Sequence, residues 1–397
     1  MKLAKRVGSI SPSPTLRITA EAKALAAQGV DVIDFASGEP DFDTPGLVKN
    51  AGIEAIHSGF TKYTAAAGID ELKSAVADKL WRDQGLTYKK SQILISCGAK
   101  HTLYNLAQAL LDVGDEVIIP SPYWVSYPDQ VLLNDAVPVL VPTTEESGFQ
   151  LTGELLERHV TSRTKAVIVN TPGNPTGSAY DRRTLEGIAE VALRHKLVII
   201  SDEIYEKILY DGLEHVSIAA LGAEVQAQTV VVNGVSKAYS MTGWRIGYAA
   251  GPEDLIAAMA TVQSQSTSNP NSMAQKAAVV ALQQGEPFIK EMVAEFDKRR
   301  RFMVDRLSKI PGFHCRMPNG AFYAFPHVGS LVGRRSPSGP ITSASDLSTY
   351  FLKEARAATV PGEGFGAPDH IRFSYATSMS KIVDGLDRIE TAVHKLT

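Results

Sequence analysis

The chain contains only two cysteines, Cys97 and Cys315, among its 397 residues. Two cysteines cannot build a disulfide framework or, by themselves, a thiolate metal site, and so few are typical of a reducing compartment such as the cytoplasm. The chain also has no marked excess of either charge, because 40 basic side chains stand against 43 acidic ones, for a formal net charge of −3. This balance predicts neither a nucleic acid nor a membrane surface as a partner.

Long hydrophobic runs and several well-known motifs are also missing. No stretch approaches the roughly 18 apolar residues that a membrane-spanning helix requires. The first residues are positively charged but not continuously apolar, so we expect no secretory signal. There is no His-Glu-x-x-His, no Gly-x-x-x-x-Gly-Lys-[Ser/Thr], and no Gly-x-Gly-x-x-Gly after an early strand, which argues against a zinc hydrolase, a P-loop enzyme and a dinucleotide-binding fold. We expect a cytoplasmic protein whose charged ligands are held by individual residues.

The length and the pattern of the middle of the chain predict a large α/β unit. At about 100–200 residues per domain, this chain is long enough for two domains. Short apolar runs alternate with amphipathic helical stretches, and several of the runs are apolar at successive positions, which favours strands covered on both faces. The result is an α/β fold with a mostly parallel central sheet flanked by helices. The predicted strands are Ile93–Ser96, Glu116–Ile119, Lys165–Asn170, Leu197–Ser201 and Thr229–Asn233, with helices at His101–Leu111 and Thr184–His195.

The last third of the chain predicts a smaller α+β domain. It begins with a helical pattern at Pro287–Ile310 and then mixes strands with a further helix. We place the boundaries so that residues 1–45 form an arm packing on the small domain, residues 46–286 the large domain, and residues 287–397 the small domain. The small domain is then built from both chain ends. Its other predicted elements are strands at Ala321–Phe325 and His370–Tyr375, a helix at Asp346–Ala355, and a loop at Gly329–Ser345 that we interpret as a solvent-exposed insertion rather than part of a site entrance.

Small and polar residues follow four of the predicted strands. In an open parallel sheet, ligands bind beyond the carboxyl ends of the strands, so these residues are expected to gather at one edge. Each also has an ordinary interpretation, as a tight turn, a helix cap, a core aromatic residue or a solvated lysine. The residues concerned are Gly98, Ala99 and Lys100 after the first strand, Asn174 after the third, Asp202 and Tyr205 after the fourth, and Ser236 and Lys237 after the fifth.

Taken together, these residues meet the requirements of pyridoxal phosphate. A lysine at the sheet edge can form a Schiff base with an aldehyde cofactor, and a nearby aspartate can keep a ring nitrogen protonated so that the ring withdraws electrons from a substrate carbanion. A turn of small residues at a helix N-terminus can bind the cofactor phosphate. The sequence therefore predicts a pyridoxal-phosphate site formed by Lys237, Asp202 and the segment Gly98–Lys100.

The segment from Ser236 to Tyr248, SKAYSMTGWRIGY, resembles the cofactor-lysine signature of the class I (fold-type I) pyridoxal-phosphate-dependent aminotransferases. Ser37–Pro45 (SGEPDFDTP), Asn174–Gly177 (NPTG) and Ser201–Tyr205 (SDEIY) match the same family in the same order. The resemblance covers essentially the whole chain and is closest to the I-gamma bacterial aspartate aminotransferases, several of which also accept prephenate. It implies the fold-type I architecture and a homodimer with shared active sites.

The resemblance also implies roles for individual residues. Lys237 would form the Schiff base and move the proton between Cα and C4′, and Asp202 would pair with the pyridinium nitrogen. Tyr205 and Asn174 would share the ring's 3-oxygen, and Trp124 would stack on the ring. The phosphate would be surrounded by Gly98, Ala99, Lys100, Ser236 and Arg245 of one subunit and by Tyr63 of the neighbouring one.

For the substrate, the resemblance makes Arg372 the clamp for the α-carboxylate, a task that suits the planar fork of arginine. The ordinary interpretation of Arg372 is a solvated strand position. Gly38 would approach the same carboxylate through its N–H group, beside Trp124 and Asn174. Thr15 and Lys100 would hold a distal carboxylate, which predicts L-aspartate with 2-oxoglutarate as the partner and prephenate as a further amino acceptor.

Three other interpretations remain open at this stage. The nearest is an aminotransferase of the same class for aromatic or neutral amino acids. The second is a non-catalytic regulator that senses the cofactor, although such proteins carry a DNA-binding domain ahead of the aminotransferase-like part and only about 45 residues precede the large domain here. The third is a pyridoxal-dependent lyase or synthase acting at Cβ or Cγ, which Lys237 and Asp202 would serve equally well.

Overall fold

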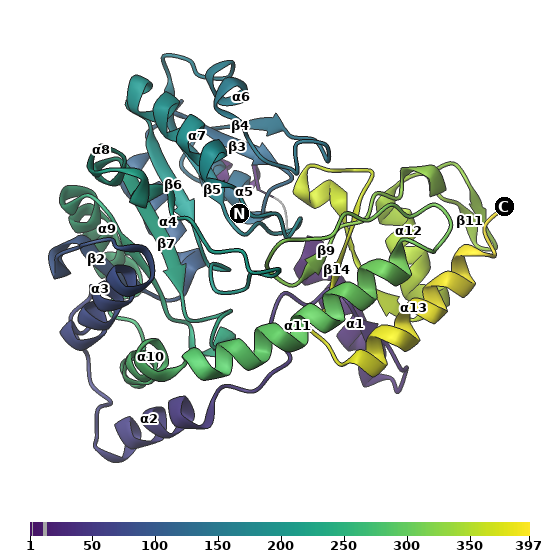
Figure 1. The fold of residues 1–397 in the computed structure, drawn as a ribbon, viewed down its shortest axis with the longest axis horizontal. Coiled ribbons are helices and arrows are strands. Elements are labelled where there is room, and N and C mark those ends of the chain that lie inside the picture. The colour runs from purple at the N-terminus through teal and green to yellow at the C-terminus, as the bar shows by residue number, and fades with distance from the viewer. Residues whose placement is uncertain (2, 11–13) are drawn as a thin grey trace.

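The structure, a computed structural model, describes residues 1, 3–10 and 14–397 (Figure 1). Its centre is a seven-stranded sheet in which every neighbouring pair is parallel except the two pairs that include β8. The predicted α/β fold with a mostly parallel sheet is confirmed. In spatial order the strands are β2 (Ile93–Ser96), β8 (Gly247–Ala250), β7 (Thr229–Gly234), β6 (Val198–Asp202), β5 (Thr164–Asn170), β3 (Glu116–Ser121) and β4 (Val137–Pro142).

Two of these strands, β4 and β8, are not among the predicted ones. β8 has the sequence GYAA, in which Tyr248 is the one large side chain, and four residues of this composition are too few to show a strand pattern. A glycine is required at its first position because a Cβ on Gly247 would lie 2.3 Å from the Ala99 nitrogen. β4 is an edge strand with mostly exposed or half-buried residues, so its pattern is weak. The five predicted strands are all present: β2 has the predicted bounds, and the ends of the other four agree with the prediction within two residues.

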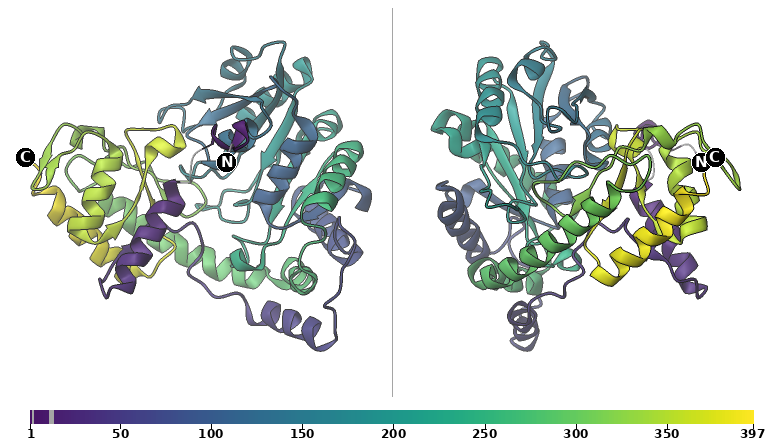
Figure 2. Two further views of the ribbon diagram at one scale, coloured as in Figure 1. Left: turned by 180° about the vertical axis from the view of Figure 1, so that it is seen from behind. Right: turned by 45° about the vertical axis from the view of Figure 1, so that its right-hand side comes forward.

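Helices cover both faces of the sheet (Figures 1 and 2). Successive residues of one strand enter different cores: Ile93 and Ile95 of β2 pack in one cluster, and Leu94 packs in another. This confirms the inference that uninterrupted apolar runs mark strands buried on both faces. The helices are α3 (Asp70–Gln84), α4 (Ala99–Leu110), α5 (Ser126–Leu132), α6 (Gly153–Glu157), α7 (Arg182–His195), α8 (Ala223–Ala227), α9 (Glu253–Ser266) and α10 (Ser272–Gln284).

The C-terminal part is an α+β layer reached through the long helix α11 (Glu286–Leu307), which runs across the molecule in Figure 1. Its antiparallel sheet has the order β13 (Val360–Pro361), β14 (Ile371–Ser374) and β9 (Tyr323–Ala324). The predicted loop at 329–345 contains a short hairpin, β10 (Arg335–Ser336) with β11 (Gly339–Pro340). The helices here are α12 (Ala344–Tyr350), which continues as a π-helical turn over Phe351–Ala355, and α13 (Met379–Val393).

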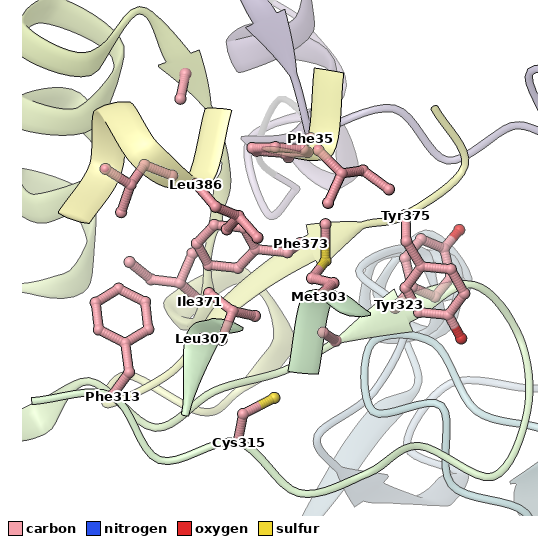
Figure 3. Close-up of a cluster of buried hydrophobic side chains, with 14 of the residues drawn as sticks. Phe35, Met303, Leu307, Phe313, Cys315, Tyr323, Ile371, Phe373, Tyr375 and Leu386 are labelled. Atoms are coloured by element: carbon pink, nitrogen blue, oxygen red, sulfur yellow. The ribbon is translucent and has the colours of Figure 1, made fainter. Parts of the chain in front are cut away.

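The N-terminal segment joins this C-terminal part rather than the large sheet. After α1 (Pro14–Ala27), β1 (Ile33–Asp34) pairs in parallel with β12 (Ala357–Ala358). Phe35 lies in the same buried cluster as Phe373 of β14 and Leu386 of α13 (Figure 3). The chain then crosses to α2 (Gly46–His57), which packs on α10 and projects from the body of the molecule (Figure 2).

One lysine is enclosed in the large part of the molecule. Lys79 of α3 is 1% exposed, and its ammonium forms an ion pair with the Glu206 carboxylate, which is itself buried. Asp83, one helical turn along α3, lies 3.7 Å from the same ammonium. The pair links α3 to the segment that follows β6. Among the residues that the structure describes, no helix is both long enough and apolar enough to cross a membrane.

Candidate active site

A cavity of about 240 Å³ opens at the carboxyl edge of the large sheet, where β5, β6 and β7 end. Two residues of the C-terminal part, Tyr323 of β9 and Arg372 of β14, close its opposite side, and Gly38 contributes from the segment after β1. The predicted site residues that line the cavity are Gly38, Ala99, Lys100, Trp124, Asn174, Asp202, Tyr205, Ser236, Lys237, Arg245 and Arg372. Residues far apart in the sequence therefore converge on one cavity, as the strand endings predicted.

One corner of the cavity has the features of an anion site. Gly98 precedes α4 with φ +91, and a Cβ at this position would lie 2.5 Å from Nη2 of Arg245. The guanidinium of Arg245 donates to the carbonyl oxygens of Thr242 (3.0 Å) and Cys97 (3.3 Å), and it forms no ion pair with any described carboxylate. At the start of α4, the N–H groups of Ala99 and Lys100 have no intrahelical partners. A cation without a counter-ion beside a helix N-terminus suits a phosphate group.

The Lys237 amine lies at the floor of the cavity. Its Nζ donates a hydrogen bond to the carbonyl oxygen of Gly38. Burial lowers its pKa to about 8, and the positive charges of Arg372 and Arg245 act in the same direction, while Glu39 and Asp202 oppose them. A substantial fraction of the amine is therefore neutral near pH 8, which is the state that a nucleophile or a base requires.

The Asp202 carboxylate, at the end of β6, is 3% exposed. The Tyr127 hydroxyl donates to its Oδ2 at 2.6 Å, and the Ile204 N–H to its Oδ1 at 3.3 Å. Burial raises the pKa of Asp202 to about 6, although both hydrogen bonds favour the ionised form. An acid in this environment gains most from a cationic partner such as a protonated ring nitrogen.

Arg372 is 2% exposed, so the interpretation as a solvated strand position is wrong. Its Nη1 donates to Oδ1 of Asn174 at 2.9 Å, and its Nη2 donates to the carbonyl oxygen of Ala36 at 2.7 Å. The buried Nε has no hydrogen-bond partner among the described groups. Because no carboxylate neutralises this buried guanidinium in the described structure, the site is suited to receiving one from a ligand.

Two tyrosines meet beside this arginine. The Tyr205 hydroxyl lies 2.7 Å from the Tyr323 hydroxyl, and either can donate. The guanidinium of Arg372 lies over the Tyr323 ring, with 4.4 Å between its Cζ and the ring centroid. Both tyrosines are buried, so neither hydroxyl can exchange its partner for bulk water at low cost.

Three predicted residues, Lys100, Tyr63 and Thr15, remain to be placed. The ammonium of Lys100 lies 4.8 Å from the centroid of the Trp124 ring, and partial burial together with the charge of Arg245 lowers its pKa. Tyr63 is 91% exposed and does not line the cavity. Thr15 belongs to α1, but its side chain lies outside the part of the chain that the structure describes.

Sequence reasoning did not find Tyr127, Tyr323 and Asn170. Asn170, the last residue of β5, donates from its amide nitrogen to the Asp202 carbonyl (3.0 Å) and accepts from the Asn174 N–H (2.9 Å), so it fixes the turn that carries Asn174. Tyr127 lies one helical turn after Trp124, which is the only local signal for it. Tyr323 lies 118 residues from its partner Tyr205, and no pattern in the sequence links the two.

Comparison with known proteins identifies the family of the chain. The model of the family described as aminotransferase class I and II matches residues 30–389, and the chain belongs to this family. It is 51% identical to a protein named aspartate aminotransferase from Geobacillus stearothermophilus, over 100% of this chain and 98% of that one. It is 46% identical to a probable aspartate/prephenate aminotransferase from Aquifex aeolicus, over 99% of both chains. The crystal structure of the aspartate aminotransferase from Rhizobium meliloti superimposes with a TM-score of 0.96 at 47% identity, covering 100% of both chains.

Proposed function

We propose that the protein is a pyridoxal-phosphate-dependent aminotransferase that moves the amino group between L-aspartate and 2-oxoglutarate. The observation that carries the proposal is the convergence of Lys237, Asp202 and Arg372 on one cavity. A half-buried amine, a buried acid and a buried guanidinium without a carboxylate partner are the three groups that an amino acid and this cofactor together require. The full-length relatives named for aspartate support the choice of substrate.

The cavity residues fit the cofactor. Arg245 and the first N–H groups of α4 would hold the phosphate, because they offer positive charge without a protein counter-ion. Asp202 would face the ring nitrogen, and Tyr205 with Asn174 would hold the ring's 3-oxygen. Trp124 would cover the ring, and Ser236 would add a hydroxyl near the phosphate. The cavity contains each of these residues.

Bound pyridoxal phosphate supplies an aldehyde that accepts the amino group and a ring that withdraws electrons from the substrate Cα. Lys237 would hold the cofactor covalently and would move the proton between the substrate Cα and the cofactor carbon C4′. Its lowered pKa keeps a usable fraction of neutral amine for this purpose. Asp202 is mostly ionised above pH 6 and would keep the ring nitrogen protonated. Arg372 fixes the α-carboxylate and thereby orients the Cα–H bond.

Lys100 is the residue that we assign to the distal carboxylate, with Thr15 as a second group. Its ammonium lines the cavity and stands over Trp124, where partial burial and the positive charge of Arg245 lower its pKa and the negative charge of Asp129 opposes that shift. A second carboxylate extending from the substrate Cα would neutralise it. Prephenate, with two carboxylates, poses the same recognition problem, and we propose it as a further amino acceptor.

We further propose that the enzyme is a homodimer whose subunits complete each other's sites. Ile53 and Ile56, one turn apart on α2, are 50% and 56% exposed, and Tyr63 is 91% exposed. A projecting helix with an exposed apolar face is typical of a surface that packs against a second copy. Tyr63 would then reach the phosphate of the neighbouring subunit.

Both cysteines are free, and the cytoplasm remains the compartment that we propose.

The division into domains also stays a proposal. We assign residues 46–286 to a large cofactor-binding domain, residues 287–397 to a small domain, and residues 1–45 to an arm on the small domain. The pairing of β1 with β12 and the placement of Phe35 among C-terminal residues support the assignment of the arm. Lys237 and Arg372 would then stand on different domains, so that relative domain motion would open and close the cavity.

The test is a donor panel with purified protein. With 2-oxoglutarate as acceptor, aspartate should give oxaloacetate and glutamate, and prephenate should replace 2-oxoglutarate as an acceptor. Lys237→Ala should abolish turnover and remove the visible absorbance of the bound cofactor. Elimination products from aspartate would instead identify a lyase and refute transamination.

A lysine variant separates acidic from aromatic specificity. Lys100→Ala should reduce kcat/KM for aspartate about tenfold or more, the effect of losing a charged contact of at least about 1.4 kcal/mol, and should reduce that for phenylalanine far less. Lys90→Ala, which removes an exposed lysine paired with Asp70 outside the cavity, is the matched control. Equal losses with both donors, or a wild-type preference for phenylalanine, would favour the aromatic alternative.

A further inference from the structure

Tyr323 occupies the boundary between the two parts of the site. It lies on β9, where it is paired in register with Ser374 of β14, and its side chain is fully buried. Figure 3 shows it at one end of the C-terminal hydrophobic cluster, whose other members are mainly apolar. A phenylalanine would suit that cluster equally well, so the hydroxyl calls for a separate explanation.

The hydroxyl has one hydrogen-bond partner in the described structure, the hydroxyl of Tyr205 at 2.7 Å. It also lies against the backbone of Gly38, because a Cβ added there would be 3.2 Å from the Tyr323 oxygen. The same Gly38 accepts a hydrogen bond from Lys237 through its carbonyl oxygen. The phenol oxygen therefore lies between the proposed ligand of the ring's 3-oxygen and the backbone that the lysine contacts.

The ring of Tyr323 has a second partner. The Arg372 guanidinium stands over its face at 4.4 Å, while Phe365 flanks the same guanidinium at 5.2 Å. A guanidinium on an aromatic face gains electrostatic attraction and loses rotational freedom. The two hydrogen bonds of Arg372, to Asn174 and to Ala36, then fix its position within that plane.

We propose that Tyr323 is a positioning residue that serves both halves of the site: its hydroxyl donates to Tyr205 and its ring supports Arg372. The inference rests on the proposed function, in which Tyr205 holds the 3-oxygen of the cofactor. A phenol has one proton, so when Tyr205 donates to that oxygen, its own oxygen is free to accept from Tyr323. Accepting this bond polarises Tyr205 and strengthens the bond that it donates.

The two roles predict different effects for two substitutions. Tyr323→Phe keeps the ring and removes the hydroxyl, so it weakens the bond from Tyr205 to the 3-oxygen. That hydrogen bond is stronger when the imine formed with Lys237 is unprotonated, because the 3-oxygen then carries more negative charge than when an iminium proton interacts with it. The bond therefore stabilises the unprotonated form. The variant should therefore raise the midpoint of the pH titration of the holoenzyme's visible absorbance by about 0.5–1 unit. Tyr323→Leu removes the ring as well.

The second readout is the affinity for a non-reacting dicarboxylate, succinate, measured by spectral titration of the holoenzyme below the absorbance midpoint. Tyr323→Phe should leave the dissociation constant within about twofold of wild type, because the ring still supports Arg372. Tyr323→Leu should raise it about 3- to 30-fold, the range expected for a lost cation–π contact. The matched control is Tyr375→Phe, which removes a buried hydroxyl from the same cluster that bonds Tyr210 and Ala321 and touches neither Tyr205 nor Arg372. It should leave both readouts unchanged.

The outcomes are distinguishable. A wild-type holoenzyme that titrates normally, with an unchanged midpoint in Tyr323→Phe, refutes the role of the hydroxyl and leaves the proposed function intact. Unchanged succinate affinity in Tyr323→Leu refutes the role of the ring. If Tyr323→Leu does not fold, Tyr323→Phe decides: because this variant keeps the ring, a weakened succinate affinity in it would also refute the role of the ring. A wild-type protein that binds no pyridoxal phosphate refutes both this inference and the proposed function.

Discussion

Removal of the Tyr127 hydroxyl should shift the pH dependence of the enzyme. In Tyr127→Phe, Asp202 loses the hydrogen bond that it accepts at 2.6 Å, while the ring that packs on Trp124 is retained. A hydrogen bond to a charged group contributes about 1.5–3 kcal/mol, against about 1 kcal/mol for neutral partners. The ionised form of Asp202 should therefore lose about 0.5–2 kcal/mol more than the protonated form, which corresponds to about 0.4–1.5 pKa units.

The sign follows from the environment of the carboxyl group. Burial already raises the pKa of Asp202 to about 6, and the bond from Tyr127 is the strongest opposing influence. Without it the pKa rises further, so a larger fraction of Asp202 is protonated near neutrality and cannot pair with a protonated ring nitrogen. We expect the acid limb of kcat/KM to move upward by about 1 unit, and the affinity for pyridoxal phosphate to fall most below pH 7.

The assay is a pH–rate profile from pH 5 to 9, together with cofactor dissociation constants at the two ends of that range. Tyr180→Phe is the matched control, because Tyr180 is a buried tyrosine of the large part whose hydroxyl accepts from the Leu151 N–H and does not touch Asp202. The control should lower stability without moving the profile. An acid limb in Tyr127→Phe within about 0.3 unit of wild type would show that this hydroxyl does not control Asp202.

Two further predictions concern stability, measured by urea unfolding of the cofactor-free protein. Asp202 has a pKa raised from 3.8 to about 6 in the folded state, so the folded protein binds the proton more tightly and wild type loses stability as the pH rises through this window. Asp202→Asn has no carboxyl group at this position and does not lose stability in this window. The free energy of unfolding of the variant relative to wild type should therefore increase between pH 4 and pH 6 and stay constant above pH 6. A difference that does not depend on pH would refute the buried-acid interpretation. Lys79→Met should cost about 3–5 kcal/mol, since it leaves the buried Glu206 carboxylate without its cation. The double variant with Glu206→Met should recover most of that loss, and additive losses would mean that the two charges do not interact.

Much of the site could be predicted because its residues belong to local segments. Lys237, Asp202 and Asn174 each lie at or just after the end of an apolar strand, and parallel strands bring their carboxyl ends to one edge. The hydrophobic pattern did not predict β8, which is only four residues long, or β4, an edge strand whose residues are mostly exposed or half-buried.

Sequence patterns could not predict the hydrogen-bond partners and the burial of these site residues. Tyr127 lies 75 residues from Asp202, and Tyr323 lies 118 residues from Tyr205, so no spacing rule connects either pair. The alternation of apolar residues around Arg372 is typical of a strand with one solvated face. In the structure β14 pairs with a strand at each edge and is buried at every residue, and the guanidinium lies near the rings of Tyr323 and Phe365.

The sequence by itself determined the scarcity of cysteine, the near-zero net charge, the α/β class and the reactive groups at the strand ends. These follow from composition, from hydrophobic period and from local turns, which a single segment carries. Only the tertiary structure decided which groups are deprived of water and which partners they receive in exchange. Burial and distance are properties of pairs of segments, and they lower the pKa of Lys237, raise that of Asp202 and leave Arg372 without a carboxylate until a ligand supplies one.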